Sequence, residues 1–392
     1  MQTAPLTSTL LGGRSPAEFL EDYWQKKPLV IRGALPDFTS PLAPEELAGL
    51  ALDEGVTSRL ILEEEGDYPW QLKEGPFEED DFLSLPETHW TLLVQEVDRL
   101  IPEVGALLEH FRFLPRWRID DIMVSYAPEG GTVGAHIDHY DVFLLQGLGH
   151  REWQIGHTPV EDASIVPDLD VRILADFEPD ETMVLEPGDM LYLPPRVAHH
   201  GIALDDCMTY SVGFRAPDQR ALVGDFLSFA LEQMDLSTRF RDPGRAPATH
   251  PGRLRPDDRR RVRMLLQDVL DDEEAINRWF GQFATRPRRD QVVTPRDEPY
   301  APEDVKARLE DGALLRHGPA SRLAFIEDRE GTVHLFVNGE EIMLSPDLGF
   351  AAPLLANHIT IPSDALRPHL DDAALLQLIT QLVNEGALEV AA

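Results

Sequence analysis

The sequence is short of cysteine and of long apolar runs, and each shortage excludes a class of protein. Its single cysteine, Cys207, excludes an internal disulfide framework and a cysteine-rich metal site, so a metal must be bound by His, Asp or Glu. No apolar run approaches the roughly 18 residues of a transmembrane helix, so no membrane contact is expected. Residues 1–13 have no basic stretch before a long apolar core, so we expect no signal peptide and a cytoplasmic protein.

Lysine is scarce as well, and acid is in large excess. Only four of the 35 basic residues are lysines, and 70 Asp and Glu residues give a net charge of −35. A field of this sign repels phosphate, so it disfavours nucleic acid as a partner of the whole molecule and favours a basic protein. A saline habitat or GC-rich coding produces the same acid excess, so the charge alone leaves the partner open.

Short apolar runs set residues 117–216 apart from the rest. They recur between glycine and proline turn signals, at a spacing that is typical of an antiparallel barrel or jelly roll. Before them we expect mainly short helices, the first capped by Ser15 and others over 41–110. The runs are 119–126, 141–145, 152–155, 182–185, 190–193 and 208–214.

After the barrel the pattern becomes helical. Apolar residues at helical spacing predict helices over 221–234 and 256–283, followed by a proline-rich linker over 285–302. The tail combines an Asn-Gly turn at 338–339 with a helical pattern over 363–386, which favours a small winged-helix-like domain.

These patterns predict an α+β chain of three parts, in line with its length. We expect a barrel domain with N-terminal helical elements over 1–216. A helical region with a linker follows over 217–300, and the winged-helix-like domain occupies 301–392.

The stretch GGTVGAHIDHYD, residues 130–141, carries the most chemical information. His136 and Asp138 are two apart, so on a strand both side chains point to one face and one metal ion can reach both. His139 and Asp141 form a second His-x-Asp pair that overlaps the first. We choose His136 and Asp138 because they directly follow the glycine-rich turn, and we expect His139 near the site or in solvent.

A third ligand is expected from another strand of the barrel. The segment 186–199, EPGDMLYLPPRVAH, combines a turn, a short apolar strand and a proline-fixed loop. It offers two adjacent candidates, because it ends on His199 and His200 follows directly. Two His and one carboxylate leave three metal positions open, as in the facial triad of non-haem Fe(II) oxygenases. Such enzymes commonly use 2-oxoglutarate, whose far carboxylate needs a fixed cation. Arg151, at the head of a predicted strand, can supply it inside the barrel or be an ordinary surface arginine.

Four stretches carry a family resemblance: FLEDYWQKKPLVIRGA, HIDHYDVFLLQGLGHREW, YLPPRVAHHG and YSVGFRAP. They resemble the JmjC-type ribosomal oxygenases, which are cupin-fold 2-oxoglutarate enzymes of the bacterial YcfD type. The resemblance covers the whole chain, because that family has a JmjC barrel (a double-stranded β-helix or jelly roll), a helical dimerisation region and a C-terminal winged-helix domain. It therefore implies a homodimer.

The resemblance also implies roles for individual residues. It places Fe(II) on His136, Asp138 and His199, which settles the choice against His200 as the ligand, and it places the 2-oxoglutarate carboxylate on Arg151. The implied reaction uses O₂ and converts 2-oxoglutarate to succinate and CO₂ while a C–H bond of a bound side chain is hydroxylated. Within YSVGFRAP, Ser211 is placed on a strand that lines the pocket.

The resemblance constrains the substrate less than the cofactors. Bacterial members hydroxylate an arginine side chain of the large-subunit ribosomal protein uL16, and eukaryotic relatives hydroxylate histidines in other ribosomal proteins. This sequence has His200 where some relatives carry an acid, and Ala198 where some carry proline. A guanidinium substrate needs carboxylates near the pocket. Asp120 and Asp121, before the glycine turn, are either those carboxylates or solvated acids at a strand start.

Two charged segments bear on other partners. Residues 239–263 hold nine arginines and can touch ribosomal RNA, but the interspersed Asp242, Asp257 and Asp258 favour a structural or dimer-surface role. The tail 303–392 has six basic and 15 acidic residues. A winged helix that binds DNA needs a basic face, so we expect that this tail does not bind DNA.

The sequence thus predicts an Fe(II)- and 2-oxoglutarate-dependent dioxygenase that hydroxylates an arginine of uL16. One alternative is a cupin metalloenzyme that does not use 2-oxoglutarate, and Arg151 discriminates between these two. The other is a non-catalytic, protein-binding cupin with a degenerate barrel, which the intact set of three ligands argues against.

Overall fold

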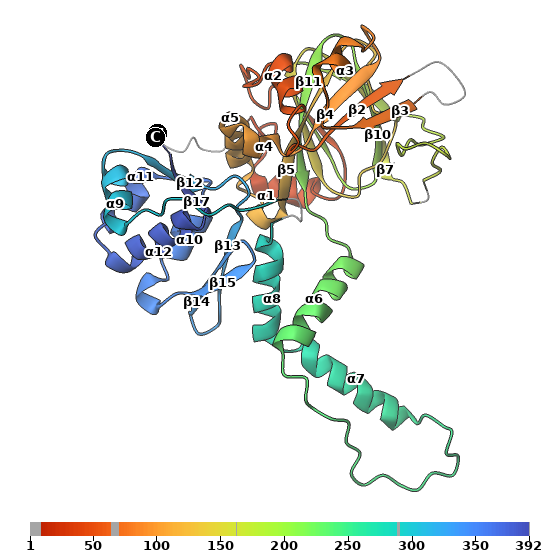
Figure 1. The fold of residues 1–392 in the computed structure, drawn as a ribbon. Coiled ribbons are helices and arrows are strands. Elements are labelled where there is room, and N and C mark those ends of the chain that lie inside the picture. Colours follow the sequence, from red (N-terminus) through yellow and green to blue (C-terminus); the bar gives the residue numbers. More distant parts are fainter. Residues whose placement is uncertain (1–8, 64–69, 162, 288–290, 392) are drawn as a thin grey trace. The chain divides into compact units, whose positions relative to one another are not determined.

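The chain forms two compact units, Met1–Ala216 and Pro217–Ala392, in a computed structural model (Figure 1). The structure describes residues 9–63, 70–161, 163–287 and 291–391. No helix among these residues is long and apolar enough to cross a membrane. The division into three domains at the expected boundaries stays a prediction.

An antiparallel sheet of eight strands, in the order β1-β9-β6-β11-β5-β4-β2-β3, forms the frame of the first unit. The sequence-based expectation of only short helices over 41–110 is wrong, because this stretch contributes β2, β3 and β4. Their apolar runs are short, and pairing of β4 with the distant β5 stabilises them. The strands are β1 (Leu29–Ile31), β2 (Ser58–Glu63), β3 (Trp70–Glu74), β4 (Trp90–Val94), β5 (Ile119–Ala127), β6 (Val142–Leu148), β9 (Met190–Leu193) and β11 (Cys207–Phe214).

A second sheet of three strands, β10-β7-β8, faces the first. Alternate side chains of the two sheets meet in one buried core, which includes Leu144 and Leu191 of the large sheet and Trp153 and Ile155 of the small one. Two facing antiparallel sheets are the jelly roll that the sequence predicts. The strands of the small sheet are β7 (Arg151–Pro159), β8 (Glu181–Leu185) and β10 (Val197–Ala203).

Aromatic side chains cover the other face of the large sheet. Phe143 is fully buried there, with its ring centroid 4.8 Å from that of Tyr192 and 5.0 Å from that of Phe111. Phe19 joins them from α1, whose first turn Ser15 caps by accepting from the Glu18 amide. The helices of this unit are α1 (Pro16–Asp22), α2 (Pro44–Leu50), α3 (Glu79–Leu83), α4 (Val97–Leu100) and α5 (Pro102–Gly105), with 3₁₀ turns η1 (Ala106–Phe111) and η2 (Arg116–Arg118).

The second unit begins with three helices, α6 (Gln219–Gln233), α7 (Pro256–Leu270) and α8 (Glu273–Thr285). The single helix predicted over 256–283 is therefore wrong. The break lies at Asp272, whose side chain accepts from the Ala275 amide and caps α8. An aspartate at this position competes with helix continuation by starting a new helix.

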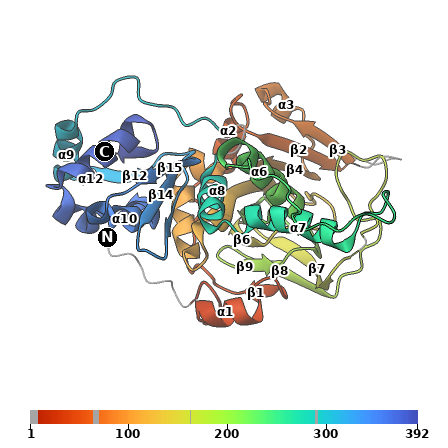
Figure 2. The same cartoon turned by 90° about the horizontal axis from the view of Figure 1, so that it is seen from below.

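The rest of the unit consists of two small sheets, β16-β12-β17 and β13-β14-β15, with helices packed around a shared apolar core (Figures 1 and 2). The predicted hairpin is present, with Asn338 and Gly339 both at positive φ, as its turn requires. The helix predicted over 363–386 is interrupted instead, because Pro368 and the N-cap Asp372 divide it. The elements are α9 (Pro302–Glu310), β12 (Leu314–His317), β13 (Leu323–Glu327), β14 (Val333–Val337), β15 (Glu340–Met343), η3 (Pro346–Leu348), α10 (Ala351–Ala356), β16 (Thr360–Ile361), α11 (Ser363–Leu366), η4 (Arg367–His369), α12 (Ala373–Asn384) and β17 (Leu388–Ala391).

Candidate functional site

The glycine-rich stretch 130–141 connects β5 to β6 as an irregular segment. His136 forms only an isolated bridge there, so the expectation that it shares a regular strand with Asp138 is wrong. Gly134 has φ +80°, and a Cβ at this position would come within 2.8 Å of the Ile173 side chain. Glycine therefore allows the backbone to turn here under the neighbouring loop.

Backbone hydrogen bonds hold this segment against β10. The His136 amide donates to the His199 carbonyl at 3.0 Å, and the His199 amide donates to the His136 carbonyl at 3.0 Å. The Arg196 amide donates to the Asp138 carbonyl at 2.6 Å. Because these bonds join backbone groups, they fix the positions of the backbone atoms from which the side chains of His136, Asp138 and His199 extend.

The side chains of His136, Asp138 and His199 converge. Each offers one ligand atom, and these atoms all lie within 4.8 Å of one another. His199 Nε2 lies 3.6 Å from Asp138 Oδ2, and the two imidazole centroids are 4.2 Å apart. No other group of three His, Cys, Asp or Glu converges in this way in the part of the chain that the structure describes.

Both histidines have the same internal hydrogen bond. Nδ1 of His136 lies 2.9 Å from the Gly134 carbonyl, and Nδ1 of His199 lies 3.0 Å from the Val197 carbonyl. In each ring the Nδ1–H therefore donates to a carbonyl, and Nε2 is left with its lone pair. Burial, and then the neighbouring His136, lower the pKa of His199 to about 4, so this ring is neutral at physiological pH.

Asp141 anchors the C-terminal end of the segment 130–141. It is fully buried; Tyr192 Oη donates to its Oδ1 at 2.7 Å and Gln25 Nε2 donates to its Oδ2 at 2.9 Å. Arg118 Nη2 adds an ion pair at 3.3 Å. Burial raises the pKa of the Asp141 carboxyl, and these three donors oppose that effect. Its role is structural, so the overlapping His-x-Asp pair does not form a second metal site.

The remaining alternatives lie away from the convergence. His139 is exposed. His200 pairs in register with Gln154, so it faces the opposite side of the small sheet from His199, which pairs with Ile155. The structure thus brings together the three side chains chosen from the sequence and neither of the other two histidines.

Arg151 lies on the inner face of the small sheet, on the same face as His199. It pairs with Ala203, four residues along β10 from His199, which corresponds to about 13 Å between Cα positions at ~3.3 Å per residue. Its residue is only 3% exposed, Nη2 lies 3.3 Å from the Cys207 sulfur, and Nε has no hydrogen-bond partner. Among the described residues no carboxylate pairs with this guanidinium.

Trp153, which the sequence analysis did not single out, fills the space between Arg151 and His199. A Cβ on Gly201 would come within 2.8 Å of its indole, so the missing side chain makes room for the ring. The indole centroid lies 6.0 Å from the His199 ring and 5.9 Å from the Arg151 guanidinium carbon. The alternation of 151, 153 and 155 along one strand was the signal that places it on this face.

The large sheet contributes polar residues to the same interior. Ser211 of β11 is 9% exposed and pairs in register with Leu144 of β6, one of the core residues between the sheets. Asp121 of β5 is 6% exposed, and its Oδ2 accepts from the Glu96 amide at 3.0 Å. Asp120 is more exposed and lies 3.6 Å from Arg215 Nε. Of the two acids, Asp121 is the one in the interior.

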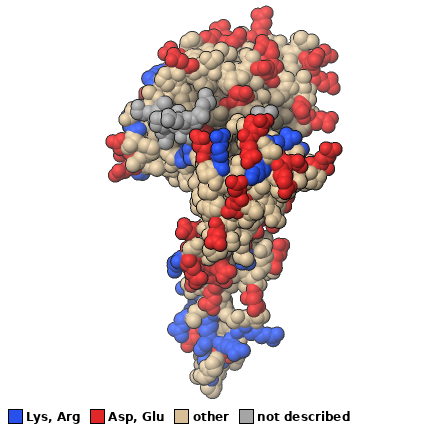
Figure 3. Space-filling model, turned by 90° about the vertical axis from the view of Figure 1, so that its left-hand side faces the viewer, with Lys and Arg blue, Asp and Glu red and all other residues tan. Residues whose placement is uncertain are grey.

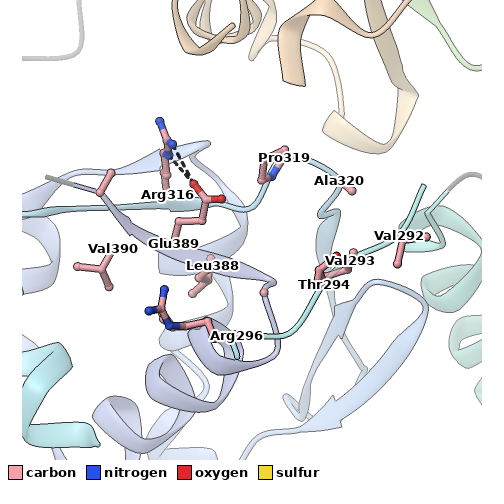
Figure 4. A pocket seen from close by; sticks show the side chains of 13 residues that line it. Val292, Val293, Thr294, Arg296, Arg316, Pro319, Ala320, Leu388, Glu389 and Val390 are labelled. Carbon is pink, nitrogen blue, oxygen red and sulfur yellow. Dashed lines mark hydrogen bonds and ion pairs between the residues drawn. The ribbon is translucent and has the colours of Figure 1, made fainter. Parts of the chain in front are cut away.

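A separate pocket of about 530 Å³ opens in the C-terminal unit between 292–296, β12 and β17 (Figure 4). Arg316 and Glu389 form an ion pair at 2.9 Å on its wall. Arg296 stacks on Tyr300, with the guanidinium carbon 3.9 Å from the ring centroid. With no histidine and one carboxylate among the 13 described residues that line it, this pocket cannot supply the ligands of a metal centre.

Two family models match the chain. The JmjC domain matches residues 106–222, and the ROXA-like winged helix matches residues 266–389. The first covers the strands β5 to β11 and the converging histidines, but not β1 to β4 of the large sheet. The second begins within α7, and it confirms the winged-helix character that was expected for the C-terminal domain.

Named relatives extend over nearly the whole length. The chain is 37% identical over 369 residues to the ribosomal protein uL16 3-hydroxylase of Escherichia coli, which covers 94% of this chain and 96% of the relative. It is 40% identical over 337 residues to a probable ribosomal oxygenase of Haemophilus influenzae, with 83% and 81% coverage.

Solved structures agree with these relatives. The Escherichia coli ribosomal oxygenase YcfD superimposes with a TM-score of 0.86 at 36% identity, covering 96% of this chain and 98% of that one. Its complex with cobalt and 2-oxoglutarate superimposes with a TM-score of 0.84 at 36% identity, covering 95% and 97%. From the identity and the shared length, the chain belongs to the family of JmjC-domain ribosomal oxygenases.

Proposed function

We propose that the chain is an Fe(II)- and 2-oxoglutarate-dependent dioxygenase that hydroxylates an arginine side chain of ribosomal protein uL16. The observation that carries the proposal is the convergence of His136, Asp138 and His199 on the barrel face that also buries Arg151. The name of the Escherichia coli relative, a uL16 3-hydroxylase, supports the substrate. Such an enzyme works in the cytoplasm, where ribosomal proteins are made.

The donor set fits Fe(II). Two imidazoles that offer Nε2 and one carboxylate are the ligands of a non-haem iron site with open positions. Bound Fe(II) supplies the redox chemistry that couples decarboxylation of 2-oxoglutarate to insertion of one oxygen atom from O₂ into a C–H bond. His136 and His199 hold the metal through Nε2 and Asp138 through its carboxylate, while the apolar core between the sheets excludes water.

The surroundings of Arg151 fit 2-oxoglutarate. A buried guanidinium without a carboxylate is costly, and a bound dianion removes that cost by pairing with it. In our proposal the far carboxylate of 2-oxoglutarate pairs with Arg151 and its 2-oxo acid end reaches the metal. The indole of Trp153 lies beside the path from Arg151 to the metal ligands, and Ser211 lies on the opposite sheet.

The interior acid fits a guanidinium substrate. Asp121 lies on the inner face of β5, and its Oδ1 faces Gly213, which has no side chain to fill the space. In our proposal this carboxylate helps to orient the substrate arginine, whereas the more exposed Asp120 pairs with Arg215. The net charge of −35 favours a basic protein, such as a ribosomal protein, as the partner.

Cobalt binding tests the metal ligands. His136→Ala or His199→Ala should weaken Co²⁺ binding by at least about 100-fold, because each removes a ligand from a three-ligand site. The visible absorption of bound Co²⁺, titrated at fixed pH, measures this. His139→Ala and His200→Ala are the matched controls and should leave the titration unchanged. Loss of Co²⁺ binding in His139→Ala, with His136→Ala intact, would show that the other His-x-Asp pair binds the metal.

The 2-oxoglutarate requirement tests Arg151. Arg151→Ala should raise the KM for 2-oxoglutarate by about 100-fold, equivalent to about 3 kcal/mol, because a buried charge pair is lost. Steady-state succinate formation measures this change. Glu152→Ala, one residue along on the outer face, is the control and should keep the wild-type KM. An unchanged KM in Arg151→Ala would assign the 2-oxoglutarate carboxylate to another cation, whereas wild-type turnover that does not depend on 2-oxoglutarate would favour the alternative cupin metalloenzyme.

Mass spectrometry of uL16 tests the substrate. Purified uL16, incubated with enzyme, Fe(II) and 2-oxoglutarate, should gain the mass of one oxygen atom on a peptide that contains arginine, with one succinate formed per modification. Replacing that arginine by lysine should abolish the gain, while omission of 2-oxoglutarate serves as the blank. Oxygen insertion at a histidine would place the chain functionally with histidyl hydroxylases, and no succinate with any ribosomal protein would favour a non-catalytic cupin.

We also propose that the chain is a homodimer joined through α6 and α7. Val223, Leu227 and Leu231 are exposed on one stripe of α6, and Val262, Leu266 and Leu270 repeat the same spacing of four residues on α7. Two exposed apolar stripes on neighbouring helices are typical of a self-complementary interface, in which each copy covers the other.

Light scattering tests the dimer. The wild type should have the mass of two chains, and the double substitution Leu227→Glu, Leu266→Glu should reduce it to one, because it buries charge in an apolar interface. Val292→Glu, also on a highly exposed apolar residue, is the control and should leave the mass unchanged. A wild type with the mass of one chain contradicts the proposal.

A further inference from the structure

One short segment opposes the charge of the rest of the chain. Residues 239–263 carry nine arginines and three aspartates, a net charge of +6, whereas the remaining residues carry −41. The segment forms the loop between α6 and α7 and the first half of α7. Figure 3 shows Lys and Arg side chains gathered over this loop and helix end.

The three aspartates of the segment form ion pairs with only two of its arginines. Asp242 and Asp258 both pair with Arg245, and Asp257 pairs with Arg260 at 2.9 Å. In the sequence, these interspersed acids favoured a structural or dimer-surface role over contact with RNA. The structure instead concentrates them on two partners, so the other seven arginines keep their charge uncompensated within it.

The seven remaining arginines are available to a partner. Arg255 and Arg261 donate only to backbone carbonyls, which leaves their charge intact. The side chains of the other five have no acidic or hydrogen-bonding partner among the described residues, and these residues are exposed: Arg239, Arg241, Arg253, Arg259 and Arg263. From 235 to 254 every residue except Asp242 is exposed, so the backbone also lies open.

We propose that this segment, the arginine arm, binds the phosphate backbone of single-stranded RNA. Guanidinium groups pair with phosphate in a forked geometry, and a string of them on an open loop suits a polyanion with closely spaced charges. Phe240, 41% exposed, stands between Arg239 and Arg241 and offers a ring on which an unpaired base stacks.

A folded acidic protein fits the arm less well. Protein interfaces depend on a buried apolar centre. Between 239 and 263 the exposed large apolar side chains are Phe240, Leu254 and Val262, and Val262 belongs to the stripe proposed for the dimer. The acids of the rest of the chain do not prevent RNA binding, because charges more than about 8 Å apart are screened at physiological salt. The arm therefore acts through its local charge.

The inference deepens the proposed function and rests on it for its biological meaning, because a ribosomal protein substrate occurs next to ribosomal RNA. RNA binding itself needs neither metal nor 2-oxoglutarate. It is therefore measured without either, so that a failure of the arm and a failure of the hydroxylase proposal give different results.

Fluorescence anisotropy with a labelled 20-nucleotide poly(U) tests the arm on the full chain. We expect binding at 50 mM KCl that weakens by about 100-fold at 200 mM KCl, as about five phosphate contacts require. The triple variant Arg239→Gln, Arg241→Gln, Arg253→Gln should bind at least about ten-fold more weakly, with a shallower salt dependence. Its hydroxylation of a uL16 peptide should stay at the wild-type rate.

The matched control removes three exposed arginines of the same unit outside the arm, Arg308→Gln, Arg329→Gln and Arg367→Gln, and should bind RNA as the wild type does. Equal losses in both variants, or no wild-type binding at 50 mM KCl, would overturn the proposal. So would tighter binding of polyglutamate than of poly(U), which would indicate an acidic protein, or a loss of dimer mass in the arm variant, which would assign the arginines to contacts between copies.

Discussion

The paired backbone hydrogen bonds between His136 and His199 are the constraint on which the site depends. They join an irregular segment to a regular strand, and the amide of each histidine donates to the carbonyl of the other. The carbonyls of Gly134 and Val197 also hold the two rings by accepting from Nδ1. The positions of both imidazoles are therefore set by hydrogen bonds to backbone groups. A metal then finds its ligands already oriented and does not have to order them, which saves conformational entropy on binding.

This arrangement is possible because one face of the large sheet is aromatic and packed, while the other face carries polar residues. One face packs Phe143, Tyr192 and Phe214 against aromatic rings from the N-terminal helices, and that burial stabilises the unit. The other face is thereby free to carry Asp121 and Ser211. Across from it the small sheet buries Arg151, for which the described part of the chain provides no carboxylate. An unpaired buried cation costs stability, so the aromatic layer supports a site whose own groups are destabilising until an anion binds.

Local chemistry decided which features could be predicted from the sequence. The barrel strands after 117, the Asn-Gly hairpin and the Ser15 cap follow from alternation and turn residues, and the structure contains them. The three side chains chosen from the sequence do converge, although the irregular backbone at His136 does not support the strand argument by which they were chosen. The strands β2 to β4 were missed because pairing with distant β5 stabilises them, and Trp153 was missed because its role depends on Gly201 across the ladder.

The distribution of charge matters more than its sum. At physiological ionic strength a charge acts over about 8 Å, so a net value of −35 does not tell what any particular surface attracts. Within the arginine arm, Asp242 and Asp258 share one arginine, and this pairing, invisible in the sequence, leaves most of the positive charge in place. Interspersed acids therefore neutralise a basic segment only if they pair with several different cations. The identity of the pairs, rather than the count of residues, determines what a charged segment can bind.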